Sequence, residues 1–166
     1  MSSHYQPTIV SPFISKHLVT PLEMFLLEQM FEVETSDDGC SLYLFAEEHI
    51  QSTIDATDPD FVKNYLTDES PLGIRFQADY LSAGSSDEFD LTTISYTDVF
   101  QAIITRHSAE LPYVSLEKAY TCTRMEPGQF GGRAEFITAT DVHHVDTGEW
   151  LNDKINEIKS VLKNKV

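Results

Sequence analysis

Cysteines and long apolar runs are both scarce in this chain of 166 residues. The two cysteines, Cys40 and Cys122, are too few for the disulfide framework of a small oxidised scaffold, so we expect reduced thiols and a cytoplasmic location. No apolar run approaches the roughly 18 residues of a membrane span. The first residues show no basic region followed by an apolar run, so the sequence predicts neither a membrane helix nor a secretory signal.

Basic residues are the second shortage. Eleven Lys and Arg stand against 27 Asp and Glu, which gives a formal net charge of −16. Residues 1–100 hold 18 of the acidic and 3 of the basic side chains, a net of −15, whereas residues 101–166 hold 9 and 8. Such a surface repels phosphates and anionic lipids, so we expect no direct binding to nucleic acid or to a membrane.

Glycine and proline are also few, at seven each, and no repeat or low-complexity tract occurs. Hydrophobic residues at 41% and aromatic residues at 11% are typical of an ordinary globular protein. A chain of this length is the size of one domain and needs no disulfide or metal to fold. We therefore expect a single acidic domain over residues 1–166, in which residues 1–19 form an arm or edge segment.

Three stretches carry helix signals. Thr20-Pro21-Leu22-Glu23 combines a capping hydroxyl, Pro at the first helical position and Glu three residues after the cap, and the helix should turn Glu23 and Glu28 outward. Ser95 to Asp98 resembles a capping box with Asp in place of Glu. A final helix should begin near Thr147, because apolar residues recur there at helical spacing: Trp150, Leu151, Ile155, Ile158 and Leu162.

Other stretches have strand or turn character. Asp37-Asp38-Gly39 is a turn signal, and the short apolar run 40–45 after it predicts a buried strand. Apolar and polar residues alternate over 74–80, which predicts a strand with one dry face, and 89–94 should pair with it as a hairpin. Asp58-Pro59 offers the start of a further short helix.

Residues 119–139 form the most conspicuous pattern, a β-hairpin closed by the glycine-rich connection 127–132. A seven-residue loop gives a register that places Cys122 beside Phe136 on a buried face and turns Glu135 toward solvent. Cys122 is then a small core residue rather than a nucleophile. Because a strand follows the glycines, a phosphate-binding loop is disfavoured.

Together these elements predict an α+β fold, with a mostly antiparallel sheet of about five strands and three or four helices packed on it.

One segment could ligate a metal ion. Asp141, His143, His144 and Asp146 place two imidazoles and two carboxylates within six residues. The spacing matches no metal motif, and in an extended segment His143 and His144 point to opposite sides. We read the segment as a solvated connection between strand and helix, and we predict no metal site and no cofactor.

Candidate residues for catalysis are lacking, since no nucleophile-elbow pattern such as G-x-S-x-G occurs. Phe130 stands apart as an aromatic at the tip of the glycine-rich connection. An exposed aromatic in a loop is a candidate anchor for a partner protein.

These observations favour a non-catalytic interaction or regulatory module whose acidic surface binds a basic partner protein, with nucleic-acid mimicry as one form of that hypothesis. Two alternatives stay open. The first is an enzyme of unrecognised type that uses a histidine and an acid in a pocket. The second is a structural or assembly subunit, a homo-oligomer in which the hairpin or a free strand edge meets a second copy.

Overall fold

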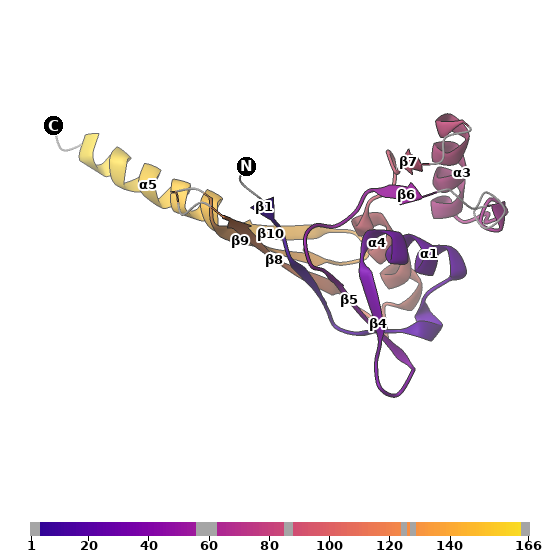
Figure 1. The fold of residues 1–166 in the computed structure, drawn as a ribbon. Coiled ribbons are helices and arrows are strands. Elements are labelled where there is room, and N and C mark those ends of the chain that lie inside the picture. The colour runs from indigo at the N-terminus through magenta and orange to yellow at the C-terminus, as the bar shows by residue number, and fades with distance from the viewer. Residues whose placement is uncertain (1–3, 56–62, 85–87, 124–125, 127–128, 164–166) are drawn as a thin grey trace.

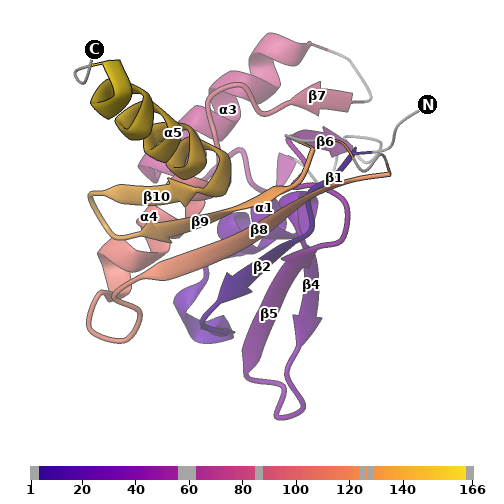
Figure 2. The same ribbon diagram turned by 90° about the vertical axis from the view of Figure 1, so that its left-hand side faces the viewer.

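The computed structural model describes residues 4–55, 63–84, 88–123, 126 and 129–163. The short helix predicted after Asp58-Pro59 begins outside this described part of the chain. Within it, an antiparallel sheet of eight strands carries α-helices on one face (Figures 1 and 2), so the α+β class is confirmed. The strand count is higher than the five expected.

The main sheet has the order β10-β9-β8-β2-β5-β3, with β1 paired to β8 and β4 paired to β5. A separate pair, β6 with β7, lies beside α3 (Figure 1). The bounds are β1 (His4–Tyr5), β2 (Thr8–Ser11), β3 (Ile14–Ser15), β4 (Glu32–Thr35), β5 (Ser41–Ala46), β6 (Thr53–Asp55), β7 (Glu88–Asp90), β8 (Val114–Cys122), β9 (Gly131–Ile137) and β10 (Val142–Asp146).

The N-terminal segment lies inside this sheet. β2 pairs with β8 on one side, where Val10 faces Leu116, and with β5 on the other, where Ile9 faces Phe45. Residues 8–11, expected in an arm or edge segment, therefore form an interior strand. Val10 is 1% exposed, and burial of its apolar side chain stabilises this interior position.

A 3-10 turn, η1 (Lys16–Leu18), and four α-helices are found in the described residues. They are α1 (Pro21–Met30), α3 (Pro71–Ala83), α4 (Tyr96–His107) and α5 (Thr147–Lys163). α1 and α4 pack together on one face of the sheet, and their apolar side chains meet those of the strands in a single core. The fully buried side chains include Leu22, Leu26, Leu27, Phe76, Phe100, Ile103, Ile104, Leu44 and Leu116.

Both predicted capping boxes are confirmed. The Glu23 amide donates to Thr20 Oγ1 at 3.3 Å, and the Thr20 amide donates to Glu23 Oε2 at 2.9 Å. At the second start, Asp98 and Ser95 exchange the equivalent bonds at 3.3 and 2.8 Å. Each box satisfies amides that a helix N-terminus leaves unpaired, so local sequence suffices to fix where α1 and α4 begin.

The strand predicted over 74–80 is wrong, because these residues belong to α3. Ser70 caps the helix, accepting from the Gly73 amide at 3.0 Å, and Pro71 occupies its first position. Leu72 and Phe76, four residues apart, are buried while Ile74 is 59% exposed. The spacing of buried residues is that of a helix, and the Ser-Pro start signal outweighs the short alternation.

The predicted hairpin exists as β8 and β9, but its register is wrong. Phe136 pairs with Ser115 and Tyr120 pairs with Gly131, whereas Cys122 pairs with His4 of β1. The two registers differ by an odd number of residues, so every β9 side chain lies on the face opposite to the expected one. Phe136 is 42% exposed and Glu135 is 5% exposed, the reverse of the prediction.

The second face of the sheet lies opposite α1 and α4 and is turned toward the viewer in Figure 2, and we call it the outer sheet face. It carries exposed apolar side chains. Its aromatic pairs include Tyr113 with Phe136, whose ring centroids lie 4.9 Å apart. The exposed members are Ile9 at 49%, Phe13 at 57%, Tyr113 at 40%, Phe136 at 42% and Val145 at 56%.

Thiol reactivity checks this arrangement. Cys40 is exposed, and Cys122 is 7% exposed, as the prediction of a core cysteine requires. We expect a thiol reagent such as Ellman's to modify one thiol rapidly in the native protein and the second only on unfolding. Cys40→Ser should abolish the fast phase, whereas two fast phases in the wild type would contradict the burial of Cys122.

Candidate functional site

Carboxylates gather where α1 ends and the β4–β5 hairpin begins. A hollow of about 430 Å³ lies there, and we call it the acidic hollow. α1 contributes Glu28, β4 contributes Glu32, and the segment after β5 contributes Glu47, Glu48 and His49. All five of these side chains are exposed.

The hollow follows directly from the local fold. β4 leaves α1 through Phe31, a buried residue whose amide donates to Leu27 O at 2.8 Å, and then pairs with β5. That pairing places Glu32 opposite Phe45, and the Glu47 amide donates to Glu32 Oε1 at 3.2 Å. The hairpin therefore brings segments some fifteen residues apart to one rim.

This charge arrangement runs against local preference. Glu28 lies in the last turn of α1, where the helix dipole favours cations, and no basic residue accompanies it there. In the described part of the chain, no salt bridge involves Glu28, Glu32, Glu47 or Glu48. These carboxylates therefore give this part of the described surface a negative potential.

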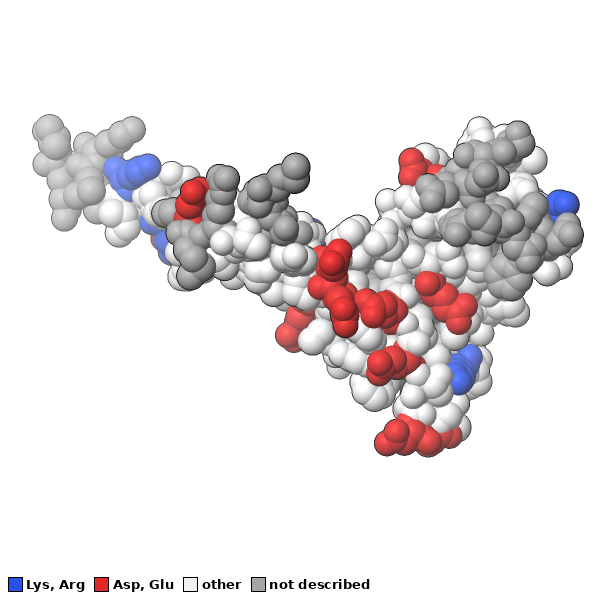
Figure 3. Space-filling model, viewed as in Figure 1, with Lys and Arg blue, Asp and Glu red and all other residues white. Residues whose placement is uncertain are grey.

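The same edge continues to the turn between β4 and β5. Glu34, Asp37 and Asp38 line a second hollow there beside Phe13 and Tyr43. The Ser36 hydroxyl and the Cys40 amide donate to Asp38, and these bonds hold the pKa of Asp38 below its usual range. In Figure 3 acidic side chains spread over the region that Figure 1 shows as β4 and β5, and basic ones are sparse there.

Histidine–acid chemistry finds little support in the described geometry. His49 lies in the acidic hollow, but its Nε2 is 3.2 Å from Gln51 Nε2 rather than from a carboxylate. His17 Nε2 does reach Glu110 Oε2 at 3.0 Å, yet the two side chains are 66% and 58% exposed. Both histidines lack the desolvated pocket that tunes a general base.

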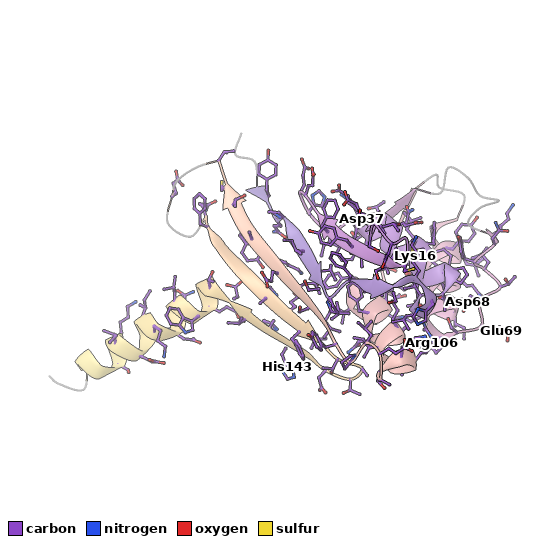
Figure 4. The ribbon with its side chains drawn as sticks, turned by 90° about the horizontal axis from the view of Figure 1, so that it is seen from below. Lys16, Asp37, Asp68, Glu69, Arg106 and His143 are labelled. Carbon is purple, nitrogen blue, oxygen red and sulfur yellow. The ribbon has the colours of Figure 1, made fainter. Side chains whose placement is uncertain are left out.

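The candidate metal ligands are not brought together. His143 pairs with Phe136 and His144 pairs with Glu135, so the two imidazoles lie on opposite faces of β10. Figure 4 shows His143 on the strand, away from Arg106 on the helical side. Asp146 Oδ1 accepts from the Gly148 amide at 2.8 Å and so caps α5. Over the described residues, no three His, Cys, Asp or Glu side chains are grouped to hold a metal ion.

Phe130, the predicted contact residue, lies just before β9 and is 47% exposed. Its exposure agrees with the expectation, and its role in binding a partner stays a prediction.

Sequence reasoning missed two buried ionic clusters. Glu135 accepts from Tyr96 Oη at 2.8 Å, from Lys118 Nζ at 3.0 Å and from Arg133 Nε at 2.8 Å. Lys118 Nζ also donates to Tyr96 Oη at 2.7 Å and lies 4.6 Å from the centre of the Tyr96 ring. These contacts tie the N-terminus of α4 to β8 and β9.

The protonation states in this cluster follow from its contacts. Burial opposes ionisation of Glu135, but the bonds from Tyr96 and Lys118 and the charges of Lys118 and Arg133 outweigh it, so the pKa of Glu135 lies below its usual range. Burial, together with the adjacent Glu135 carboxylate, raises the pKa of Tyr96 above its usual range. Tyr96 therefore stays a donor and Glu135 stays an anion near neutral pH.

The second cluster joins α1 to α4. Arg106 Nη1 and Nη2 donate to the two oxygens of Glu23, each at 2.6 Å, and Nη2 also reaches Leu18 O at 3.2 Å. Glu23, expected to face outward, is 2% exposed. Its place in the capping box was readable from the sequence, but its partner lies 83 residues away.

Each described helix is too short or too polar to cross a membrane. Comparison of the chain with protein-family models, with curated proteins and with solved structures finds no match in any of the three.

Proposed function

We propose that this protein is a non-catalytic interaction module that binds a basic partner protein through the acidic hollow and the adjoining β4–β5 turn. The observation that carries the proposal is the set of exposed carboxylates of Glu28, Glu32, Glu47 and Glu48, which converge from α1, β4 and the end of β5 without salt-bridge partners in the described residues. A partner that presents Lys or Arg would supply the missing counter-charge.

An exposed acidic surface is expected to bind in a salt-dependent way. Exposed charges contribute to the rate of association and to specificity more than to affinity, and salt screens them beyond about 8–10 Å at physiological ionic strength. Aromatic side chains at the turn, Phe13 and Tyr43, have ring centroids 5.3 Å apart and border the second hollow. They would add apolar contact beside the charges.

A charge-neutralising variant tests the proposal. Affinity capture with the wild-type protein from a lysate of the cells that encode it should retain a basic protein at low salt and release it at high salt. Glu32→Gln/Glu47→Gln/Glu48→Gln should lower the association rate of that protein by at least about tenfold, as expected when steering charges are lost. Surface plasmon resonance measures the rate.

The control removes the same number of charges elsewhere, from the exposed residues Glu69, Glu126 and Asp153, as the corresponding Gln and Asn variants. These substitutions should leave the rate within about twofold, since distant exposed charges are screened. An equal fall in the association rate for both triple variants would show that net charge, rather than the acidic hollow, governs binding. If the partner binds nucleic acid, a DNA duplex should compete with this protein, and failure to compete would reject the mimicry form of the proposal.

A further inference from the structure

α5 is an amphipathic helix whose apolar side chains lie in solvent. Its 17 residues extend about 25 Å, and Figure 1 shows them projecting away from the sheet and the other helices. A single helix of this length is marginal in water without tertiary packing. Its exposed apolar members are Trp150 at 55%, Leu151 at 53%, Ile155 at 49% and Ile158 at 62%.

Hydrogen bonds at the N-terminal end of α5 hold it to the sheet. The helix begins at Thr147, the residue that follows β10, with no linker between them. Asp146 Oδ1 accepts from the amides of Gly148 and Glu149 at 2.8 and 3.2 Å, and Thr147 Oγ1 accepts from the Gly132 amide at 2.9 Å. The bond from the Gly132 amide ties the start of α5 to β9, and the apolar stripe of the helix is exposed to solvent.

The outer sheet face offers the matching surface. Its apolar side chains Ile9, Phe136 and Val145 come from β2, β9 and β10, and all three are exposed. A hollow of about 330 Å³ lies on this face between Glu117, Ala134, Phe136 and Val145. It is open to a docking side chain.

Charge disfavours a parallel pairing of two α5 helices. Leu151, Ile155 and Ile158 follow the a and d positions of a heptad, which places Lys154 and Lys159 at the flanking g and e positions. In a parallel helix pair, Lys154 of one helix would meet Lys159 of the other and repel it. On the outer sheet face the exposed carboxylate of Glu117 lies between Ile9 and Ala134.

The charge balance of the whole chain agrees. Residues 147–166 hold 4 basic and 3 acidic side chains, a net of +1, whereas residues 1–146 hold 7 and 24, a net of −17. Two acidic bodies repel each other, but α5 adds no net negative charge to the contact, since it holds three basic and three acidic side chains.

We infer that two copies of this chain form a dimer in which α5 of each copy packs its apolar stripe on the outer sheet face of the other. A two-fold axis makes the exchange reciprocal, so both helices and both sheet faces are covered in one closed assembly. The inference does not depend on the proposed function, because it rests on α5 and on β2, β8, β9 and β10 rather than on the carboxylates of the acidic hollow.

The mass of the full chain in solution is the first test. Sedimentation equilibrium at micromolar concentration should give the mass of two chains. Ile155→Lys/Ile158→Lys should give one chain, and Asn156→Lys/Ser160→Lys, which adds the same charge on the polar side of α5, should remain dimeric. A monomeric wild type would overturn the inference, as would a dimer that survives Ile155→Lys/Ile158→Lys. Near-ultraviolet circular dichroism checks that the variants keep the folded core.

Disulfide trapping identifies the surface that α5 meets. In a Cys40→Ser background, Ile155→Cys and Phe136→Cys are prepared separately and then mixed in equal amounts under mild oxidation. The inference requires a disulfide between the two different variants. A disulfide formed by Ile155→Cys alone in preference to the mixed one would show helix-to-helix pairing and reject docking on the sheet.

Discussion

Replacing Arg106 with alanine should lower the free energy of unfolding by about 3–5 kcal/mol, the range expected when a buried charge loses its partner. The guanidinium supplies two bonds of 2.6 Å to Glu23, whose side chain is 2% exposed. Without Arg106, the carboxylate keeps the Thr20 amide as its remaining described donor. Chemical denaturation at neutral pH measures the loss.

Two comparisons separate this effect from the loss of any surface arginine. Arg75 also bonds a carboxylate from a helix, at 2.7 Å to Asp98, but the two side chains are 41% and 29% exposed. Arg75→Ala should therefore cost no more than about 1 kcal/mol. Glu23→Ala should cost less than Arg106→Ala, because the arginine left behind is 38% exposed and can be hydrated. The opposite order would contradict the view that the buried carboxylate sets the cost.

Glu135→Ala is expected to destabilise the protein by a similar amount, about 3–5 kcal/mol. The residue that loses its partner, Lys118, is 11% exposed, and Arg133 and Tyr96 lose a contact as well. Replacing the cluster together, as Glu135→Leu/Lys118→Met/Tyr96→Phe, should restore most of the loss, because the one charge that remains, Arg133, is 31% exposed and can be hydrated. A triple variant less stable than Glu135→Ala would show that packing rather than charge governs the site.

The pH dependence of Glu135 has a definite sign. Its folded-state pKa is depressed, so the folded protein binds the proton less readily than the unfolded chain does. The contribution of the ionised group is therefore fully present above the unfolded value of 4.5 and is lost as the pH falls through the lower folded value. The stability difference between wild type and Glu135→Gln should be largest near neutral pH and should shrink below about pH 4, measured by urea denaturation.

The features that the sequence predicted correctly depend on residues close together in the chain. The Thr20 and Ser95 helix starts depend on bonds that span three residues, and both formed as read. The acidity of the first hundred residues also pointed to carboxylate surfaces, although it could not say which would meet. Convergence of Glu28 with Glu47 depends on the β4–β5 pairing, and the spacing of charges along the chain does not encode that pairing.

The failures arose where two readings of one pattern compete. Residues 74–80 alternate like a strand, yet Ser70 and Pro71 start a helix whose buried positions are four apart. In the hairpin, the glycines at 131 and 132 suggested a tight connection, but they pair within β9 opposite Tyr120 and Ala119. Lys118 on the inward side of β8 was the available signal for a buried acid, and it needed the correct register to be used.

The interior position of β2 constrains the order in which the protein can assemble. Ser11 pairs with Ser115, so about a hundred residues must be made before the second neighbour of β2 exists. During synthesis on the ribosome, the first fifty residues can form α1 and the β4–β5 hairpin, but one side of β2 stays an open template for pairing. Pairing between segments so far apart in the sequence slows folding. A chain that ended before β8 would expose an unpaired edge of β2, which can pair with another chain and aggregate.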